Sequence, residues 1–129
     1  MVIDSSALMS ILLDEQERPL FRDALAEATS PVISAATFVE VSIAAMSRRG
    51  DRGRHQLSQI IAQNGIRIIP VDEELARLAV DAWARFGQGR HPARLNYGDC
   101  FSYALAVKLG EPLLYKGNDF AQTDVRSAL

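Results

Sequence analysis

Short apolar runs alternate with longer amphipathic segments along the chain, and this alternation limits the folds that are open to it. Runs rich in apolar residues lie at 2–3, 31–33, 66–71 and 112–115. The segments between them have the 3.6-residue periodicity of helices. Buried strands of a parallel sheet are apolar on both faces and are joined by helices. We therefore expect a three-layer α/β/α fold, with a short central parallel sheet flanked by helices.

Capping residues and glycines set the ends of the expected helices. Asp72 and Asn96 are of the types that accept hydrogen bonds from the first free N–H groups of a helix. Gly50 and Gly110 follow amphipathic segments and are typical of helix ends. The helices expected from these signals cover about 5–13, 19–28, 34–49, 52–63, 72–86 and 96–109.

The chain has the length and composition of one globular domain, residues 1–129. It contains no repeat or linker, and 48% of its residues are hydrophobic, which supports a proper core. No run approaches the roughly 18 apolar residues of a membrane span. Met1 is followed by neither a basic nor a long apolar segment, so we expect no signal peptide. Cys100 is the only cysteine, which fits a reducing compartment and leads us to expect a cytoplasmic protein.

Four acidic residues stand where strands end or helices begin. Asp4 follows the first expected strand, Asp119 follows the last, Asp99 lies in the first turn of a helix, and Glu40 interrupts a long apolar stretch. Ligands of open parallel sheets bind beyond the carboxyl ends of the strands, so these side chains can face one crevice. Taken singly, each has an ordinary interpretation, as a cap, a turn residue or a solvent-facing acid.

Together the four acids point to a hard divalent cation. Mg²⁺ and Mn²⁺ prefer oxygen ligands, and they activate water for phosphodiester cleavage. One cysteine and two histidines, His55 and His91, do not assemble an ordinary zinc site. We interpret His91 as an exposed loop residue and not as a general base.

Four segments in order resemble the acidic motifs of PIN domains, and of VapC toxins in particular. They are Val2–Ser6, Phe38–Val41, Leu95–Ala106 and Leu114–Phe120, and the resemblance spans the whole chain. The most specific parts are Asn-Tyr-Gly-Asp at 96–99 and Gly-Asn-Asp-Phe at 117–120.

This resemblance implies a ribonuclease that uses Mg²⁺ or Mn²⁺. Asp4 and Asp99 match the positions of direct metal ligands, and Glu40 and Asp119 would complete the pocket, bind a second metal ion or orient water. Ser6, Asn96 and Asn118 match supporting polar positions. The family also implies an RNA substrate, a VapB-type antitoxin as partner and a homodimer. The tail after Asp119 is short, so we expect a final edge strand that is abbreviated or missing.

Two arginine clusters are candidates for RNA binding, although the net charge is −2. Arg48 and Arg49 belong to one cluster, and Arg90 and Arg94, which lead into the Asn96–Asp99 motif, belong to the other. Phosphate attraction supplies most sequence-independent affinity for nucleic acid. Both clusters could equally be solvated turns or protein contacts.

Two alternatives remain open. A phosphoryl-transfer domain also places an aspartate after its first strand, but the second aspartate of one such class is absent at Ser6. A non-catalytic PIN-fold module that binds RNA or protein could retain all four acids.

Overall fold

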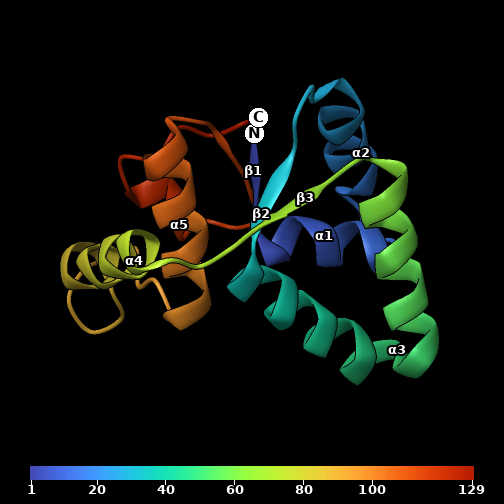
Figure 1. Ribbon diagram of the computed structural model, residues 1–129, viewed down its shortest axis with the longest axis horizontal. Coiled ribbons are helices and arrows are strands. Elements are labelled where there is room, and N and C mark those ends of the chain that lie inside the picture. The colour runs from blue at the N-terminus through green and yellow to red at the C-terminus, as the bar shows by residue number, and fades with distance from the viewer.

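The computed structural model describes residues 1–129 as four parallel strands between two layers of helices (Figure 1). The sheet has the order β3-β2-β1-β4. Its strands are β1 (Val2–Ile3), β2 (Val32–Ser34), β3 (Arg67–Ile69) and β4 (Leu113–Leu114). One face carries α1 (Ser5–Leu12), α2 (Arg18–Glu27) and α3 (Ala35–Gln63), and the other carries α4 (Glu73–Phe86) and α5 (Tyr97–Leu109). The α/β/α architecture expected from the sequence is confirmed.

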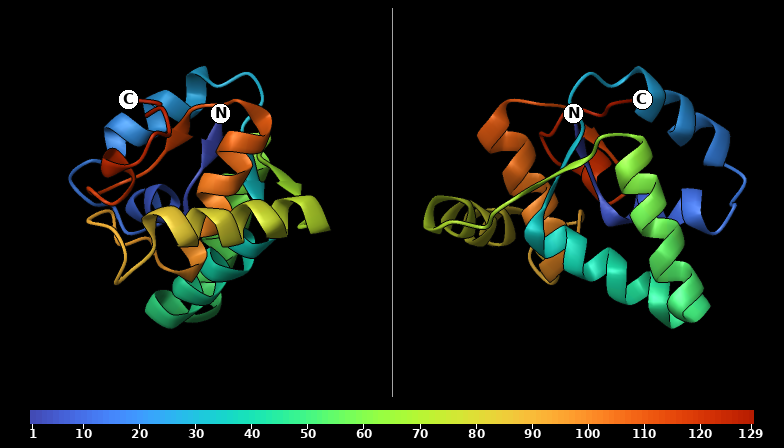
Figure 2. Two further views of the ribbon diagram at one scale, coloured as in Figure 1. Left: turned by 90° about the vertical axis from the view of Figure 1, so that its left-hand side faces the viewer. Right: turned by 45° about the vertical axis from the view of Figure 1, so that its right-hand side comes forward.

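Successive residues of the strands pack into two separate hydrophobic cores, one on each face of the sheet. Val2, Val32 and Leu113 pack with α4 and α5 in one core. Their neighbours Ile3, Ile33 and Leu114 pack with α1, α2 and α3 in the other. This division explains why the strands are apolar on both faces. The left view of Figure 2 looks onto the layer of α4 and α5, and the right view shows the two helical layers on either side of the strands.

The strand order places a topological switch at β1. The chain moves from β1 to β2 and β3 in one direction, and β4 then pairs with the free side of β1. Such a switch opens a crevice beyond the carboxyl ends of the two central strands. Asp4, the first residue after β1, stands at this switch point.

Two expected elements differ from the structure, and a third, the tail, agrees with the expectation. The strand expected at 66–71 shortens to Arg67–Ile69, because β3 is an edge strand whose side chains are largely exposed. The helices expected on either side of Gly50 meet without a loop, and α3 bends there as Gly50 adopts a φ of 57°. The tail forms only an isolated bridge from Ser127 to Leu113, as expected of an abbreviated edge strand.

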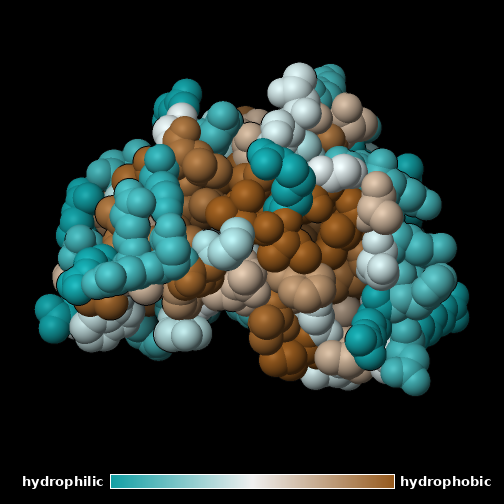
Figure 3. Space-filling view, in the orientation of Figure 1, coloured by the Kyte–Doolittle hydropathy of each residue, from teal (hydrophilic) through white to brown (hydrophobic).

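The surface is partly apolar on the face seen in Figure 1. Figure 3 shows apolar surface at the centre of this view and below it, towards the first half of α3. Val39 and Ile43 of that helix are 55% and 56% exposed, so its apolar residues are not all core. None of the helices combines the length and the hydropathy that crossing a membrane requires.

Candidate functional site

Asp4 is fixed at the end of β1 by hydrogen bonds to both carboxylate oxygens. Its Oδ2 caps α1 by accepting from the backbone N–H of Ser6 at 2.9 Å and from the Ser6 hydroxyl at 2.6 Å. Its Oδ1 accepts from the Ser102 hydroxyl at 2.6 Å. The residue is only 2% exposed. A carboxylate held by three donors has one orientation, which suits a site that must be preorganised.

A chain of three buried hydroxyl groups ends at the carboxylate of Asp4. The Ser34 hydroxyl is 2.8 Å from that of Thr37, which lies 3.3 Å from the Ser102 hydroxyl. On the other side, the Ser6 hydroxyl accepts from the backbone N–H of Lys116 at 3.0 Å and so ties α1 to the segment after β4. Sequence reasoning missed Thr37 and Ser102. Ser102 lies three residues after Asp99 in a largely apolar helix, a spacing that places both side chains on one helix face.

Asp99 lies in the first turn of α5 and forms a capping box with Asn96. The Asn96 side chain accepts from the backbone N–H of Asp99 at 2.9 Å, and Asp99 Oδ2 accepts from that of Asn96 at 2.8 Å. Burial, opposed by this hydrogen bond and reinforced by the charges of Asp4, Asp119 and Glu40, raises the pKa of Asp99 to about 7. Asp99 therefore does cap α5, but it does so close to the negative charges of three other carboxylates.

Glu40 faces the same centre from the second turn of α3. Its Oε2 is buried without a hydrogen-bond partner, which contradicts the interpretation as a solvent-facing acid. Burial and the charge of Asp4 raise the pKa of Glu40, and Ser5 acts in the opposite direction. A Cβ atom on Gly98 would lie 2.4 Å from Oε2 of Glu40, so the glycine makes room for this carboxylate beside α5.

Asp119 is exposed and stands at the start of a short 3₁₀ helix, Phe120–Gln122. Its side chain makes no capping hydrogen bond, but its charge contributes to the raised pKa of Asp99. Asn118 is exposed beside it, and no hydrogen bond of its side chain supports the site. The structure thus brings the four predicted acids into one electrostatic neighbourhood at the switch between β1 and β4.

The arrangement of the four acids fits a divalent cation that keeps much of its shell of bound water molecules. No three His, Cys, Asp or Glu side chains are grouped closely enough to enclose a metal ion. Mg²⁺ commonly retains several waters and binds one or two carboxylates, so it does not need such a cage. The buried, unpartnered oxygen of Glu40 and the like charges around Asp99 are features that a cation would relieve.

The predicted RNA-binding arginines lie in different settings. Arg90 and Arg94 are exposed on the loop before α5, and the guanidinium of Arg90 lies 4.6 Å from the ring centroid of Trp83. Arg48 is exposed, whereas Arg49 is half-buried and donates to Gln56 at 3.1 Å. None of the four arginines forms an ion pair with an acid, which leaves their charges free for a partner.

Asp124 and His91, two other residues considered for the site, make structural contacts. Asp124 pairs with Arg85 at 2.9 Å and accepts a hydrogen bond from the Tyr103 hydroxyl. These contacts attach the C-terminal segment to α4 and α5. His91 was expected to be exposed, but it is half-buried. Its ring packs edge-on against Phe86 with centroids 5.0 Å apart, which explains its burial.

Comparisons with known proteins agree with this geometry. The family model of the PIN domain matches residues 1–126. Ribonuclease VapC28 of Mycobacterium tuberculosis is 46% identical over 130 residues, which cover 100% of this chain and 98% of that protein. Ribonuclease VapC of Mycolicibacterium smegmatis is 45% identical over 125 residues, 97% of each chain.

Solved structures show the same fold at lower identity. The crystal structure of Mycobacterium tuberculosis VapC20, described as a toxin that cleaves the sarcin–ricin loop, has a TM-score of 0.79 at 16% identity over 96% of this chain and 95% of that one. A chain of a toxin–antitoxin complex from Klebsiella pneumoniae has a TM-score of 0.69 at 21% identity, over 95% and 92% of the two chains. Fold, family model and sequence identity together lead to one conclusion: the chain belongs to the PIN-domain family and to its VapC group of ribonucleases.

Proposed function

We propose that the acidic centre cleaves RNA phosphodiester bonds with the help of Mg²⁺ or Mn²⁺. The observation that carries this proposal is the placement of Asp4, Glu40, Asp99 and Asp119 around the switch between β1 and β4, where burial and then the charges of the other three acids raise the pKa of Asp99. Four carboxyl groups with no basic partner are costly to keep together. Their arrangement is understandable where a divalent cation neutralises them.

Each residue of the centre has a distinct task in this proposal. Asp4, held by Ser6 and Ser102, and Asp99, held by Asn96, would hold the cation. A bound divalent cation supplies an activated water molecule and stabilises charge on the leaving oxygen. The Glu40 carboxylate, whose pKa is raised by burial, is suited to accept the proton of the attacking water. Asp119, exposed at the rim, would orient that water.

The proposed partners follow from the relatives and from the surface. A structural neighbour occurs in a toxin–antitoxin complex, and we infer that a VapB-type antitoxin restrains this chain. We also propose a cytoplasmic location, which the single cysteine fits and where RNA substrates are present. We propose that two copies of the chain form a homodimer through a groove between α4 and α5. All the residues that line this groove are apolar: Ala76, Ala79, Val80, Trp83, Tyr97, Cys100 and Phe101. Apolar side chains this exposed commonly mark an interface.

The deciding experiment is cleavage of total bacterial RNA by the purified chain, free of antitoxin. Reactions would contain Mg²⁺, Mn²⁺ or EDTA, and would be run beside Asp4→Asn and the control Asp23→Asn. Asparagine keeps an oxygen that can cap α1, so the fold is preserved while the charge is lost. Asp23 is an exposed acid of α2 and lies outside the centre.

We expect discrete fragments that require metal, persist with Asp23→Asn and disappear with Asp4→Asn. End-mapping of the fragments would identify the RNA that is cut. Equal cleavage by the wild type and Asp4→Asn would refute the assignment of the centre. No cleavage with any metal, from protein that still binds RNA, would favour the non-catalytic module.

A further inference from the structure

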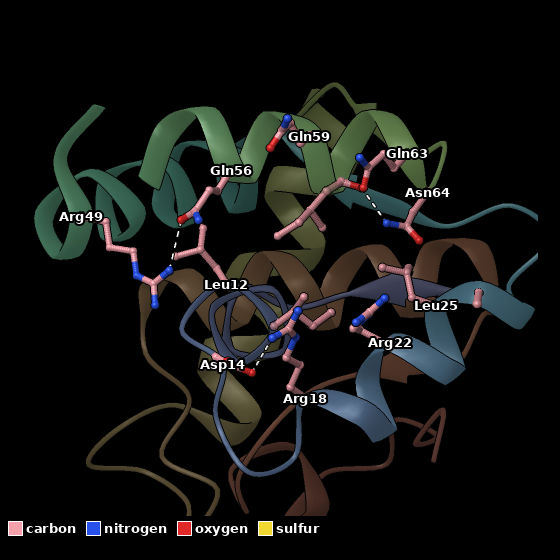
Figure 4. Close-up of a pocket in the computed structure, with 13 residues that line it drawn as sticks. Leu12, Asp14, Arg18, Arg22, Leu25, Arg49, Gln56, Gln59, Gln63 and Asn64 are labelled. Atoms are coloured by element: carbon pink, nitrogen blue, oxygen red, sulfur yellow. Dashed lines mark hydrogen bonds and ion pairs between the residues drawn. The ribbon is translucent and has the colours of Figure 1, made fainter. Parts of the chain in front are cut away.

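A second polar site lies at the C-terminal end of α1, whereas Asp4 of the acidic centre lies at the N-terminal end of that helix. A pocket of about 470 Å³ opens between α1, α2 and the second half of α3. Figure 4 shows three arginines around it, Arg18 and Arg22 from α2 and Arg49 from the bend of α3. Apolar side chains of all three helices also line the pocket, together with four side-chain amides: Gln56, Gln59, Gln63 and Asn64.

The pocket carries an excess of positive charge in a chain whose net charge is negative. Its only carboxylate is Asp14, which pairs with Arg18. That hydrogen bond and the charge of Arg18, with smaller contributions from Arg49 and Arg22, lower the pKa of Asp14. The pocket thus holds three guanidinium groups and one carboxylate. Arg18 is paired with this carboxylate, so the positive charges of Arg22 and Arg49 are not neutralised by an ion pair.

Several donors of the pocket are unused. Nε of Arg18 is buried and has no hydrogen-bond partner. Arg49 donates only to the neutral oxygen of Gln56, at 3.1 Å. Arg22 is exposed and forms no ion pair. Guanidinium groups present several N–H donors in a planar fork that matches the oxygens of phosphate, so the pocket is built to receive an oxyanion.

The same two helices connect the pocket with the acidic centre. Helix α1 begins after Asp4 and contributes Leu12 to the pocket, and its eight residues span about 12 Å. Helix α3 carries Glu40 near its start and Arg49 just before its bend. One strand of RNA that crosses α1 can therefore contact both sites, which favours RNA over an unrelated anionic ligand.

We propose that the Arg18–Arg22–Arg49 pocket holds a backbone phosphate of the RNA, a few nucleotides away from the bond that is cut. The inference rests on the proposed ribonuclease function, which it extends with a second contact to the substrate. A phosphate in this pocket would set how far the strand extends from the cut, and would add affinity that does not depend on base identity.

The test measures binding of a fluorescein-labelled single-stranded RNA by anisotropy, in EDTA so that no RNA is cleaved. The double variant Arg22→Gln/Arg49→Gln is compared with Arg77→Gln, an exposed arginine of α4 outside the pocket. Arg18 stays in place because it pairs with Asp14. We expect the double variant to bind roughly tenfold more weakly, with a salt slope reduced by about 0.7 for one lost phosphate contact. Arg77→Gln should match the wild type.

A third variant makes the opposite prediction and so controls for misfolding. Asp14→Asn removes the only carboxylate of the pocket, and asparagine tolerates the left-handed backbone at this position, where φ is 60°. We expect it to bind the RNA more tightly than the wild type, by about twofold or more. A variant that merely damages the fold would not gain affinity.

The outcomes separate this inference from the proposed function. Unchanged affinity and salt slope in the double variant, from a wild type that cleaves RNA, would overturn the phosphate site and leave the nuclease intact. Loss of antitoxin binding with unchanged RNA binding would assign the pocket to a protein partner and also overturn the inference. Weakened RNA binding by the double variant, from a wild type that cuts no RNA, would support the pocket while the nuclease proposal fails.

Discussion

Asp99 must be ionised to bind a cation, yet its surroundings favour the protonated form. Its pKa is raised to about 7, chiefly by burial and then by neighbouring acids. In the unfolded chain the group has its ordinary value, 3.8. Between these two values the folded state retains a proton that the unfolded state has lost. Raising the pH through this window therefore destabilises the metal-free protein.

We predict that the free energy of unfolding in EDTA falls between pH 4 and pH 7, by at most about 4 kcal/mol from this group. Asp99→Asn should flatten this dependence and melt above the wild type at pH 8. Asparagine can keep the capping box, so the variant removes the charge without removing the cap. Urea titrations at several pH values measure the effect, with exposed Asp81→Asn as control. Parallel curves for wild type and Asp99→Asn would contradict the prediction.

Ser102 tests whether the orientation of Asp4 matters for turnover. Its hydroxyl donates to Asp4 Oδ1 at 2.6 Å, and a hydrogen bond to a charged group contributes about 1.5–3 kcal/mol. We predict that Ser102→Ala lowers kcat about tenfold and leaves KM nearly unchanged, because the residue positions Asp4 and does not touch RNA. Steady-state kinetics with Ser47→Ala, an exposed serine of α3, provide the comparison. A change confined to KM would show that Ser102 acts differently.

At the scale of elements, the first turn of α5 has to accommodate the carboxylate of Glu40. A Cβ at position 98 would stand 2.4 Å from Oε2 of Glu40, the movable end of a flexible side chain. We predict that Gly98→Ala folds normally but displaces Glu40, so that activity falls at least about tenfold while the melting temperature changes little. Circular dichroism and RNA cleavage measure the two quantities. Full activity would mean that Glu40 has no fixed position in the reaction.

The sequence predicted those elements and residues whose signals are local. Asp72 and Asn96 are caps, and each was recognised from the few residues that follow it. Ser102 was missed because its partner Asp4 lies 98 residues away, a contact that only the folded sheet creates. The length of β3 was overestimated for a related reason, since its edge position depends on the strand order and not on its own residues.

For the molecule as a whole, metal binding should couple the acidic centre to global stability. A ligand that binds only the folded state stabilises it by about 2.7 kcal/mol at a concentration 100 times its Kd. We predict that Mg²⁺ raises the melting temperature of the wild type, and does so more at pH 8 than at pH 5, where Asp99 with its pKa of about 7 holds a proton that the cation must displace. Asp99→Asn should start from a higher melting temperature in EDTA and gain less from Mg²⁺. Differential scanning calorimetry with matched ionic strength separates this effect from salt screening. Equal gains in the wild type and the variant would place the cation elsewhere on the molecule.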